Sequence, residues 1–497
     1  MREIRSYLIA ALLAGLVVSL NFDPVALPYA AIVGVAALFV LAHKLAGLVL
    51  TWWQVASIGI AFGLGFMGPL IWWMNAISHG AYIALVLVEA LYFAAVLMGL
   101  RVVAWQPWWP IAMPMVWVLG ESVRSAFPFS GFPWGRLAHV TIDTPLAGYV
   151  RWLGQPTTSY IVALFAAGLA WFVIRPRERV WSILAAAVVA FFVGALLPTG
   201  LAGGDGGAGA SAEVALVQGN IPGAFLTWKP GDIFQLHAAE TDRLVERIAH
   251  GDEPKPDVVL WPENSTDVDP FHDAQQAARI ETLAGTLGAP ILVGGLFDGP
   301  TVDTAYNAGV VWTASGPEGR YVKRKVVPYG EYVPFRAVLG PLVPKFNRFI
   351  PRNMLPGDQP NVLPAGRVML GDTICWDIAF DGLLREAVKG GAQMIVVQTS
   401  NASFTGTAQP EQQFKIARLR AIETGRWVLI PSTNGISAIV DAKGDVLARA
   451  PMHQPALLSA GVPLAAGSTV GVDLGPWPQY GLMVGALLAI GVGWRRW

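Results

Sequence analysis

The chain has 497 residues, of which 54% are hydrophobic and 14% charged, and its mean hydropathy is +0.49. This balance lies far outside that of an ordinary soluble protein and indicates a membrane protein. The formal net charge is zero, so we expect no nucleic-acid partner, and a single cysteine excludes an intrachain disulfide.

Apolar runs that are long enough, or nearly long enough, to cross a bilayer predict eight transmembrane helices. The first run follows Arg2 and Arg5, and no clear small-residue cleavage site follows it, so we expect a retained helix instead of a cleaved signal peptide. The expected spans are Tyr7–Phe22, Val25–His43, Leu48–Leu70, Ala81–Ala104, Trp108–Val123, Thr157–Ile174, Val180–Pro198 and Pro478–Trp494.

The positions of Lys and Arg in the short loops predict the orientation in the membrane. With both termini in the cytoplasm, an odd number of spans before the soluble stretch places that stretch in the periplasm of a diderm bacterium. The outside loops then carry only Arg124, Arg136 and Arg151. The inside segments carry Arg2, Arg5, Lys44, Arg101, Arg175, Arg177, Arg179, Arg495 and Arg496.

Two features of the membrane part carry polar groups. Glu89 lies inside an apolar run, where a carboxyl group needs a partner. We expect that it pairs with another residue of the helix bundle, in preference to a catalytic role. The loop from Glu121 to Tyr149 contains ESVR and SGFPWG, whose aromatic residues are typical of anchors at the membrane interface.

The sequence predicts four segments. Residues 1–198 form a seven-helix transmembrane domain, and residues 199–212 contain the flexible Gly/Ala-rich linker LAGGDGGAGASA. Residues 213–468 form a periplasmic domain, and residues 478–497 form the last span with a cytoplasmic tail.

The periplasmic segment alternates short β-rich runs with helical patterns, which predicts an α/β domain with its own core. Helices are expected at Ile233–His250, Ala274–Leu287, Gly382–Lys389 and Pro410–Thr424. Strands are expected at Val214–Gln218, Val258–Trp261, Ile291–Gly295, Ala308–Thr313, Val368–Ile374, Met394–Gln398, Trp427–Pro431 and Ser437–Asp441.

Three residues at the ends of strand-like runs could form a catalytic site. Cys375 ends the run VMLGDTI at an elbow before a helix, Glu263 follows DVVLWP, and Lys323 lies in the β-like segment RYVKRKVV. An inert buried thiol, a helix-capping Glu and a solvated Lys are the ordinary interpretations of each residue alone. Together they fit nucleophilic catalysis, because a thiol needs a carboxylate to accept its proton and an ammonium favours the thiolate.

Histidine is the usual alternative base for such a nucleophile. The four histidines of the soluble segment lie in helical or turn segments with no motif around them, which disfavours a Cys-His or Ser-His-Asp site. They are His237, His250, His272 and His453.

The periplasmic segment resembles the nitrilase, or carbon–nitrogen hydrolase, superfamily. The motifs that carry this resemblance are WPEN, YVKRKVVPYGE and TICWD. The catalytic Glu, Lys and Cys of the superfamily correspond to Glu263, Lys323 and Cys375. With seven helices before this segment and one after, and with VQGNIP and SGFPW, the whole chain resembles the apolipoprotein N-acyltransferase family of the bacterial inner membrane.

The resemblance implies an αββα sandwich and a two-stage acyl transfer without metal or organic cofactor. Cys375 would take an acyl chain from a phospholipid, typically phosphatidylethanolamine, and pass it to the N-terminal amine of an S-diacylglyceryl apolipoprotein. Glu263 would be general base and then acid. Lys323 and a backbone N–H near Trp376 would stabilise the oxyanion, and Glu331 would orient Lys323.

Substrate contacts are expected from five further residues. Trp376 and Asp377 stand where the family usually has Tyr and Glu, which could reshape the acyl pocket, and SNASFTGTAQPEQQ lacks the family's Asp-Ala-Trp-Phe. Residues 331–356 mix apolar side chains with cations, which predicts an arm at the membrane interface. The expected contacts are Trp228, Phe346, Phe349, Asp377 and Asn401.

Two other classes of protein compete with the acyltransferase. A membrane-anchored amidase of the same superfamily would keep the three residues but release the acyl group to water. A transporter with a periplasmic binding domain would explain the helices, but no inverted repeat is evident in them, and the three catalytic residues would have no task.

Overall fold

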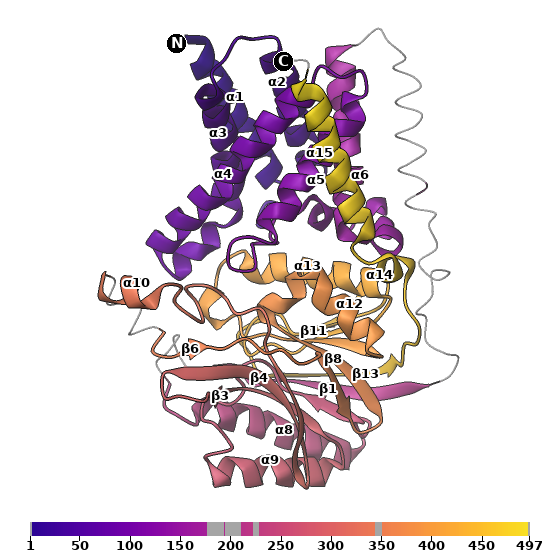
Figure 1. Ribbon diagram of the computed structural model, residues 1–497. Helices are drawn as coiled ribbons and strands as arrows, with labels where there is room; N and C mark the ends of the chain where they lie inside the picture. The colour runs from indigo at the N-terminus through magenta and orange to yellow at the C-terminus, as the bar shows by residue number, and fades with distance from the viewer. Residues whose placement is uncertain (1, 176–192, 194–209, 222–227, 343–349, 496–497) are drawn as a thin grey trace. The chain divides into compact units, whose positions relative to one another are not determined.

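The computed structural model describes residues 2–175, 193, 210–221, 228–342 and 350–495 (Figure 1). It divides into two compact units, Met1–Thr199 with Val470–Trp497, and Gly200–Thr469. The expected span at residues 180–198, most of the Gly/Ala-rich linker, and Phe346 and Phe349 lie outside the described residues.

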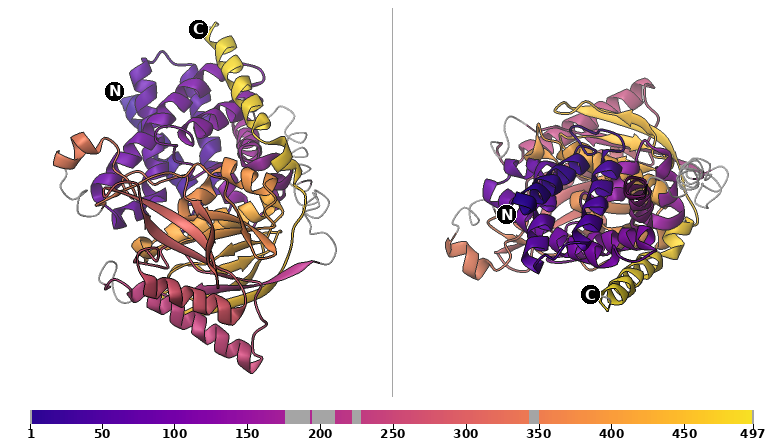
Figure 2. Two further views of the ribbon diagram at one scale, coloured as in Figure 1. Left: turned by 60° about the horizontal axis from the view of Figure 1, so that its bottom comes forward. Right: turned by 90° about the horizontal axis from the view of Figure 1, so that it is seen from above.

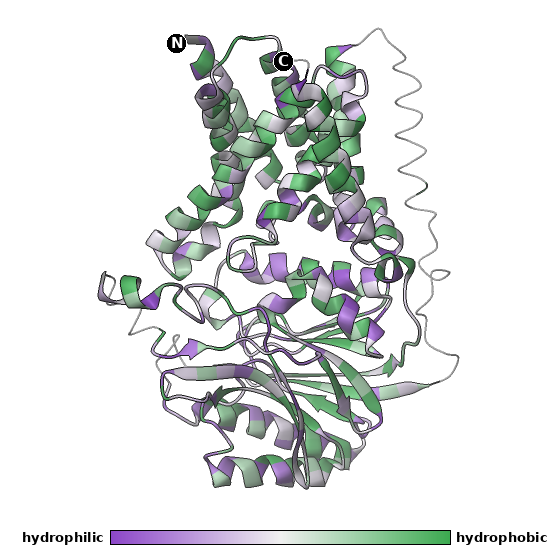
Figure 3. Cartoon of the chain, viewed as in Figure 1, coloured by the Kyte–Doolittle hydropathy of each residue, from purple (hydrophilic) through white to green (hydrophobic). Residues whose placement is uncertain are grey.

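The first unit is helical. Among its described residues, three helical segments are long and apolar enough to cross a membrane, namely Trp52–Leu70, His79–Val103 and Pro145–Ile174, and Ala30–Ala46 is a shorter apolar helix (Figure 3). The other described helices fall short in length or apolar composition, so the eight-span bundle stays a prediction. The helices are α1 (Arg2–Ser19), α2 (Ala30–Ala46), α3 (Trp52–Leu70), η1 (Trp72–Ala76), α4 (His79–Val103), α5 (Trp109–Arg124), η2 (Leu137–Thr141), η3 (Pro145–Ala147), α6 (Gly148–Ile174), α14 (Val470–Leu474) and α15 (Trp477–Trp494).

Small residues bring α3 and α4 into close contact. A Cβ on Gly59 would lie 2.4 Å from the carbonyl oxygen of Phe93, and one on Gly63 would lie 2.6 Å from the Cα of Ala90. Both distances are too short for any side chain, so the two backbones touch there. Such contacts between small residues are typical of helices that associate in membranes.

Arg124 at the end of α5 holds the loop that carries SGFPWG. Its guanidinium pairs with Glu89 of α4 at 3.4 Å and donates hydrogen bonds to the carbonyls of Phe132, Trp134 and Gly135 at 2.9, 2.6 and 3.0 Å. Glu89 therefore has a partner within its own unit, and the loop folds around that ion pair. The ion pair gives the carboxylate of Glu89 and the guanidinium of Arg124 a partner of opposite charge at a place where both side chains are shielded from water.

The second unit contains two β-sheets. The first has the strand order β13-β1-β2-β3-β4-β5, with β6 paired to β4, and the second has the order β12-β11-β10-β9-β8-β7. The strands are β1 (Ser211–Gln218), β2 (Val258–Leu260), β3 (Ile291–Asp298), β4 (Thr304–Thr313), β5 (Gly316–Val322), β6 (Asn353–Met354), β7 (Val362–Ala365), β8 (Val368–Ile374), β9 (Met394–Gln398), β10 (Val428–Ile430), β11 (Ala438–Val440), β12 (Val446–Arg449) and β13 (Ala456–Pro463).

The second unit is a four-layer αββα sandwich. One apolar core, which includes Leu260, Leu370 and Val396, fills the space between the sheets, and another packs the first sheet against two helices. These helices, α8 (Asp232–His250) and α9 (Ala274–Leu287), lie side by side outside the first sheet, as Figure 2 also shows. On the second sheet lie α12 (Asp381–Lys389) and α13 (Gln409–Thr424). The α/β architecture that the alternating pattern predicted is confirmed.

Each sheet has a parallel centre, which gathers several chain ends at one edge. β1, β2 and β3 run parallel in the first sheet, and β8, β9 and β10 run parallel in the second. Residues that follow the carboxyl ends of parallel strands meet at the same edge, where ligands usually bind in such sheets. The residues just after β2, β8 and β9 are Trp261, Cys375 and Thr399.

Candidate active site

Cys375 stands at a strained elbow directly after β8. Its φ is 51°, in the left-handed region that L-residues rarely adopt, and the short 3-10 helix η4 (Cys375–Ala379) leads from it to α12. A strained turn between strand and helix projects a nucleophile from the end of its sheet. The residue as a whole is partly exposed.

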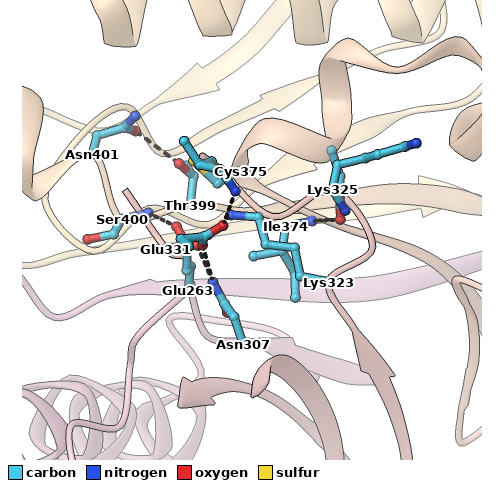
Figure 4. A network of polar contacts seen from close by, with 12 residues as sticks. Glu263, Asn307, Lys323, Lys325, Glu331, Ile374, Cys375, Thr399, Ser400 and Asn401 are labelled. Carbon is cyan, nitrogen blue, oxygen red and sulfur yellow. Dashed lines mark hydrogen bonds and ion pairs between the residues drawn. The ribbon is translucent and has the colours of Figure 1, made fainter. Parts of the chain in front are cut away.

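Two acidic side chains meet one buried lysine beside the thiol (Figure 4). Lys323, the residue after β5, donates to Glu331 Oε1 at 2.7 Å and lies 3.4 Å from Glu263 Oε1. Burial alone would lower the pKa of Lys323, but the carboxylates of Glu331 and Glu263 raise it well above its usual value. The lysine therefore presents a fixed positive charge in the site.

Asn307 of β4 joins the two carboxylates. Its Nδ2 donates to Glu263 Oε1 at 2.8 Å and to Glu331 Oε1 at 3.1 Å. The other oxygen of Glu331 accepts from the backbone N–H of Val327 at 2.7 Å. Both carboxylates and the ammonium are thus held in one network, which fixes their positions before any substrate arrives.

The second sheet holds Glu263 from its other side. The backbone N–H of Ser400, after β9, donates to Glu263 Oε2 at 3.0 Å, and the hydroxyl of Thr433 donates to the carbonyl of Glu263 at 2.7 Å. Glu263 lies in the turn that follows β2 of the first sheet, so these bonds connect the two sheets at the site. The sequence gave no signal for either bond, because both depend on how the sheets are placed.

The surroundings of the thiol keep it protonated. Desolvation and the nearby Glu263 carboxylate raise the pKa of Cys375 to about 12, against the opposing effects of Lys323 and a hydrogen bond with Thr399. The resting group at neutral pH is therefore the thiol and not the thiolate. Attack on a substrate then requires a base that takes the proton as the bond forms.

We expect this pKa to appear in the reaction of Cys375 with iodoacetamide. Because the thiolate fraction grows with pH as long as the pH is below the pKa, the alkylation rate should rise about tenfold per pH unit from pH ~7 to ~9 without a plateau. Mass spectrometry of the Cys375 peptide at several pH values measures it. A plateau at neutral pH would mean a preformed thiolate.

The structure places the other predicted residues in different surroundings. Asp377 is fully buried and accepts from the hydroxyl of Tyr321 at 2.8 Å and from the backbone N–H of Lys325 at 2.9 Å. Burial raises its pKa to about 6, which Lys323 and Tyr321 oppose. Its oxygens bond to groups of the protein and hold the elbow, and its contact with substrate stays a prediction.

Asn401 is also turned to the protein interior. It is 6% exposed, and its amide donates to the side chains of Gln409 and Gln413 at 2.9 and 3.0 Å. Gln413 of α13 in turn donates to the carbonyl of Cys375 at 3.3 Å, so Asn401 supports the elbow through Gln413, and its contact with substrate stays a prediction. Trp228 and Trp376 are partly buried, and Trp376 packs edge-on against Phe380.

Two family models match the chain. The family model of carbon–nitrogen hydrolases matches residues 213–470, so the second unit is a carbon–nitrogen hydrolase domain. The model of the apolipoprotein N-acyltransferase N-terminal domain matches residues 14–168.

Relatives of similar length agree with this. A protein of Mycolicibacterium smegmatis described as apolipoprotein N-acyltransferase is 34% identical over 97% of this chain and 83% of its own. Relatives of the same description from Shewanella oneidensis and Vibrio vulnificus are 29% and 27% identical, over 87% and 98% of this chain and 86% and 96% of their own. The chain belongs to the apolipoprotein N-acyltransferase family and is an acyltransferase. An amidase structure from Nesterenkonia sp. aligns with 54% of this chain and 94% of its own at 20% identity and a TM-score of 0.35.

Proposed function

We propose that this protein transfers an acyl chain from a membrane phospholipid to the N-terminal amine of an S-diacylglyceryl apolipoprotein, through a thioester on Cys375. The observation that carries the proposal is the meeting of Cys375, Glu263 and Lys323 at one edge of a sandwich, in a chain of this family. Phosphatidylethanolamine is proposed as donor on the family resemblance alone.

In the first stage Glu263 takes the Sγ proton while the sulfur attacks the ester carbonyl carbon. The ammonium of Lys323, with a backbone N–H near Trp376, stabilises the negative oxygen of the tetrahedral intermediate. The carbon–oxygen bond then breaks, and Glu263 gives its proton to the departing glycerol oxygen. The products of this stage are the acyl-Cys375 thioester and a lysophospholipid.

In the second stage the apolipoprotein amine attacks the thioester carbon. Glu263 accepts a proton from the amine and returns one to Sγ as the carbon–sulfur bond breaks, so an amide forms and the thiol is restored. No proton or electron is left over in the cycle. The residues of the chain therefore suffice for the reaction.

Genetic rescue tests the proposal as a whole. A strain depleted of its own lipoprotein N-acyltransferase should grow when it expresses this chain, and its lipoproteins should carry a third acyl chain. The matched control is the Cys375→Ala variant at the same expression level. Failure of the parent chain to rescue, although it is present in the membrane, would contradict the proposal.

Glu331 should affect the rate without being essential. Glu331→Gln removes the negative charge that pairs with Lys323 at 2.7 Å but keeps an acceptor for Val327. A lost charge-assisted hydrogen bond costs about 1.5–3 kcal/mol, or about 10- to 100-fold in rate. Formation of the acyl-enzyme from phospholipid, followed by intact mass, should be slowed to this extent. Unchanged kinetics would show that Glu331 does not position the lysine.

The orientation of the chain in the membrane is also a proposal. The Lys and Arg residues that favour a cytoplasmic N-terminus place residue 177 in the cytoplasm and residue 206 in the periplasm. Alkaline phosphatase fused near Gly206 should be active, and the same reporter after Arg177 should be inactive. The reverse pattern would put the catalytic domain on the side where no diacylglyceryl apolipoprotein is exposed.

A further inference from the structure

A buried carboxyl group that the proposed mechanism does not use lies three residues before Cys375. Asp372 of β8 has no exposed surface, and by distance and angle neither of its carboxyl oxygens has a hydrogen-bond donor among the described residues, although the backbone N–H of the adjacent Thr373 lies near enough to lower its pKa. An ionised carboxylate in such a place is strongly unfavourable, because it loses its hydration and gains only the interaction with that one N–H in return. The carboxyl oxygens of Asp372 therefore need another hydrogen-bonding arrangement.

A second unpartnered oxygen lies on the neighbouring strand β9. Gln398 is fully buried, and its Nε2 donates to the carbonyl of Trp261 at 2.6 Å. That bond fixes the orientation of the amide, so the other atom, facing away from Trp261, is the acceptor Oε1. Oε1 has no donor among the described residues.

The two oxygens border the same small space over Gly309 of β4. A Cβ on Gly309 would lie 2.3 Å from Asp372 Oδ2 and equally 2.3 Å from Gln398 Oε1, so both atoms occupy the space that any larger residue would fill. Two acceptors this near each other repel unless a proton lies between them. One proton on Asp372 gives both atoms a partner at once.

The charges around Asp372 favour the protonated form. Burial raises the pKa of Asp372 well above its usual value and the carboxyl group of Asp377 adds to this effect, while the backbone N–H of Thr373 opposes it. The other titratable group that interacts with it is the hydroxyl of Tyr321, which is neutral and donates to Asp377. No ion pair within the described part of the chain includes Asp372.

We propose that Asp372 is a neutral carboxylic acid that donates a hydrogen bond to Gln398 Oε1, and that the resulting connection Asp372–Gln398–Trp261, here called the inter-sheet bridge, is a positioning device for the nucleophile and the base. The proposal deepens the proposed function and rests on the roles given there to Cys375 and Glu263.

Each member of the inter-sheet bridge lies just before a residue of the site. Asp372 precedes Cys375 by three residues, and Trp261 precedes Glu263 by two. Gln398 is in register with Ile374, and after it come Thr399, which bonds the thiol, and Ser400, which bonds Glu263. The other contacts in the core between the sheets are mainly apolar, and apolar contacts do not fix direction. A hydrogen-bonded bridge therefore helps to fix the position of one sheet relative to the other, as catalysis requires.

Two substitutions of similar size separate the possible roles of Asp372. Asp372→Asn keeps a neutral group that can donate to Gln398 Oε1, and so acyl-Cys375 should form from phosphatidylethanolamine in detergent micelles within about twofold of the parent rate, with the same pH profile. Asp372→Leu cannot donate. Its saturating rate should fall at least about tenfold while the lipid concentration for half-maximal rate stays unchanged, because the reacting groups and not the lipid site are displaced.

Infrared difference spectroscopy of full-length parent and Asp372→Asn tests the proton directly. The parent should show the carbonyl band of a protonated carboxylic acid at neutral pH, and the variant should lack it. Absence of this band in the parent, or a shifted pH profile in Asp372→Asn, would show a charged Asp372 and overturn the proposal. A Leu variant that melts earlier but acylates at the parent rate would refute the positioning role.

The same experiments separate this inference from the proposed function. If the parent forms no acyl-Cys375 from phospholipid, the proposed function fails, while the infrared band still decides whether the proton is present. If the Leu variant does not fold, the Asn variant and the band decide the inference alone.

Discussion

Cys375→Ala should abolish formation of the acyl-enzyme and all transfer to the apolipoprotein amine. Sγ is the only atom in the site that can form a thioester, and the chain has no second cysteine to replace it. The elbow itself should persist, because alanine at φ 51° is under the same backbone strain as cysteine and Gln413 still bonds the backbone carbonyl.

The readout is the intact mass of the protein after incubation with phospholipid, together with the melting temperature. We expect no added acyl mass in the variant and a melting temperature close to that of the parent. Glu331→Gln serves as the matched control, because it alters the same site but keeps the nucleophile. Full transfer by Cys375→Ala would end the thioester mechanism.

Glu263→Gln should lower the rate of acyl-enzyme formation by about 10²- to 10⁴-fold, the usual contribution of general acid–base catalysis. The variant cannot take the thiol proton or return it to the glycerol oxygen. The Glu263 carboxylate raises the pKa of the Cys375 thiol, so its removal should lower that pKa and increase the thiolate fraction. The substitution should therefore slow acyl transfer, which needs the base, but not reactions that need only the thiolate.

Comparison of two reactions of the same sulfur separates these effects. Iodoacetamide needs only the thiolate, so alkylation of Cys375 in Glu263→Gln should be as fast as in the parent at neutral pH, or faster. Acylation by phospholipid should be nearly lost in the same preparation. Equal slowing of both reactions would show that the substitution disturbs the site instead of removing a base.

The interior strands and helices of the catalytic domain could be predicted from sequence because their patterns are strong. The structure confirms β8, β9 and α9 at the predicted residues and places α8, α12 and α13 within one residue of the expected bounds. The prediction missed β6, β7, β12 and β13, and of β5 it marked only the end, in the β-like segment around Lys323. These strands are short or lie toward the edges of their sheets, and several expose one face, so no continuous apolar run marks them.

The three catalytic candidates could be predicted from the sequence, but the groups that hold them in place could not. Cys375, Glu263 and Lys323 stand at strand ends beside turn residues, which is a local pattern. Asn307 lies inside β4, and the N–H of Ser400 is a backbone group that any residue would supply. The bonds of Asp377 could not be predicted for the same reason, since only the fold brings Tyr321 and Lys325 to its oxygens.

The most direct test of the central claim follows one acyl chain through the purified full-length protein. Labelled phosphatidylethanolamine is added first, and the Cys375 peptide is analysed for a hydroxylamine-sensitive acyl adduct. An S-diacylglyceryl peptide with a free amine is then added. We predict that the label leaves Cys375 and appears as an amide on the peptide N-terminus. Release of the label as free fatty acid, at the same rate with and without the peptide, would instead mean that water is the acceptor and that the protein is a hydrolase.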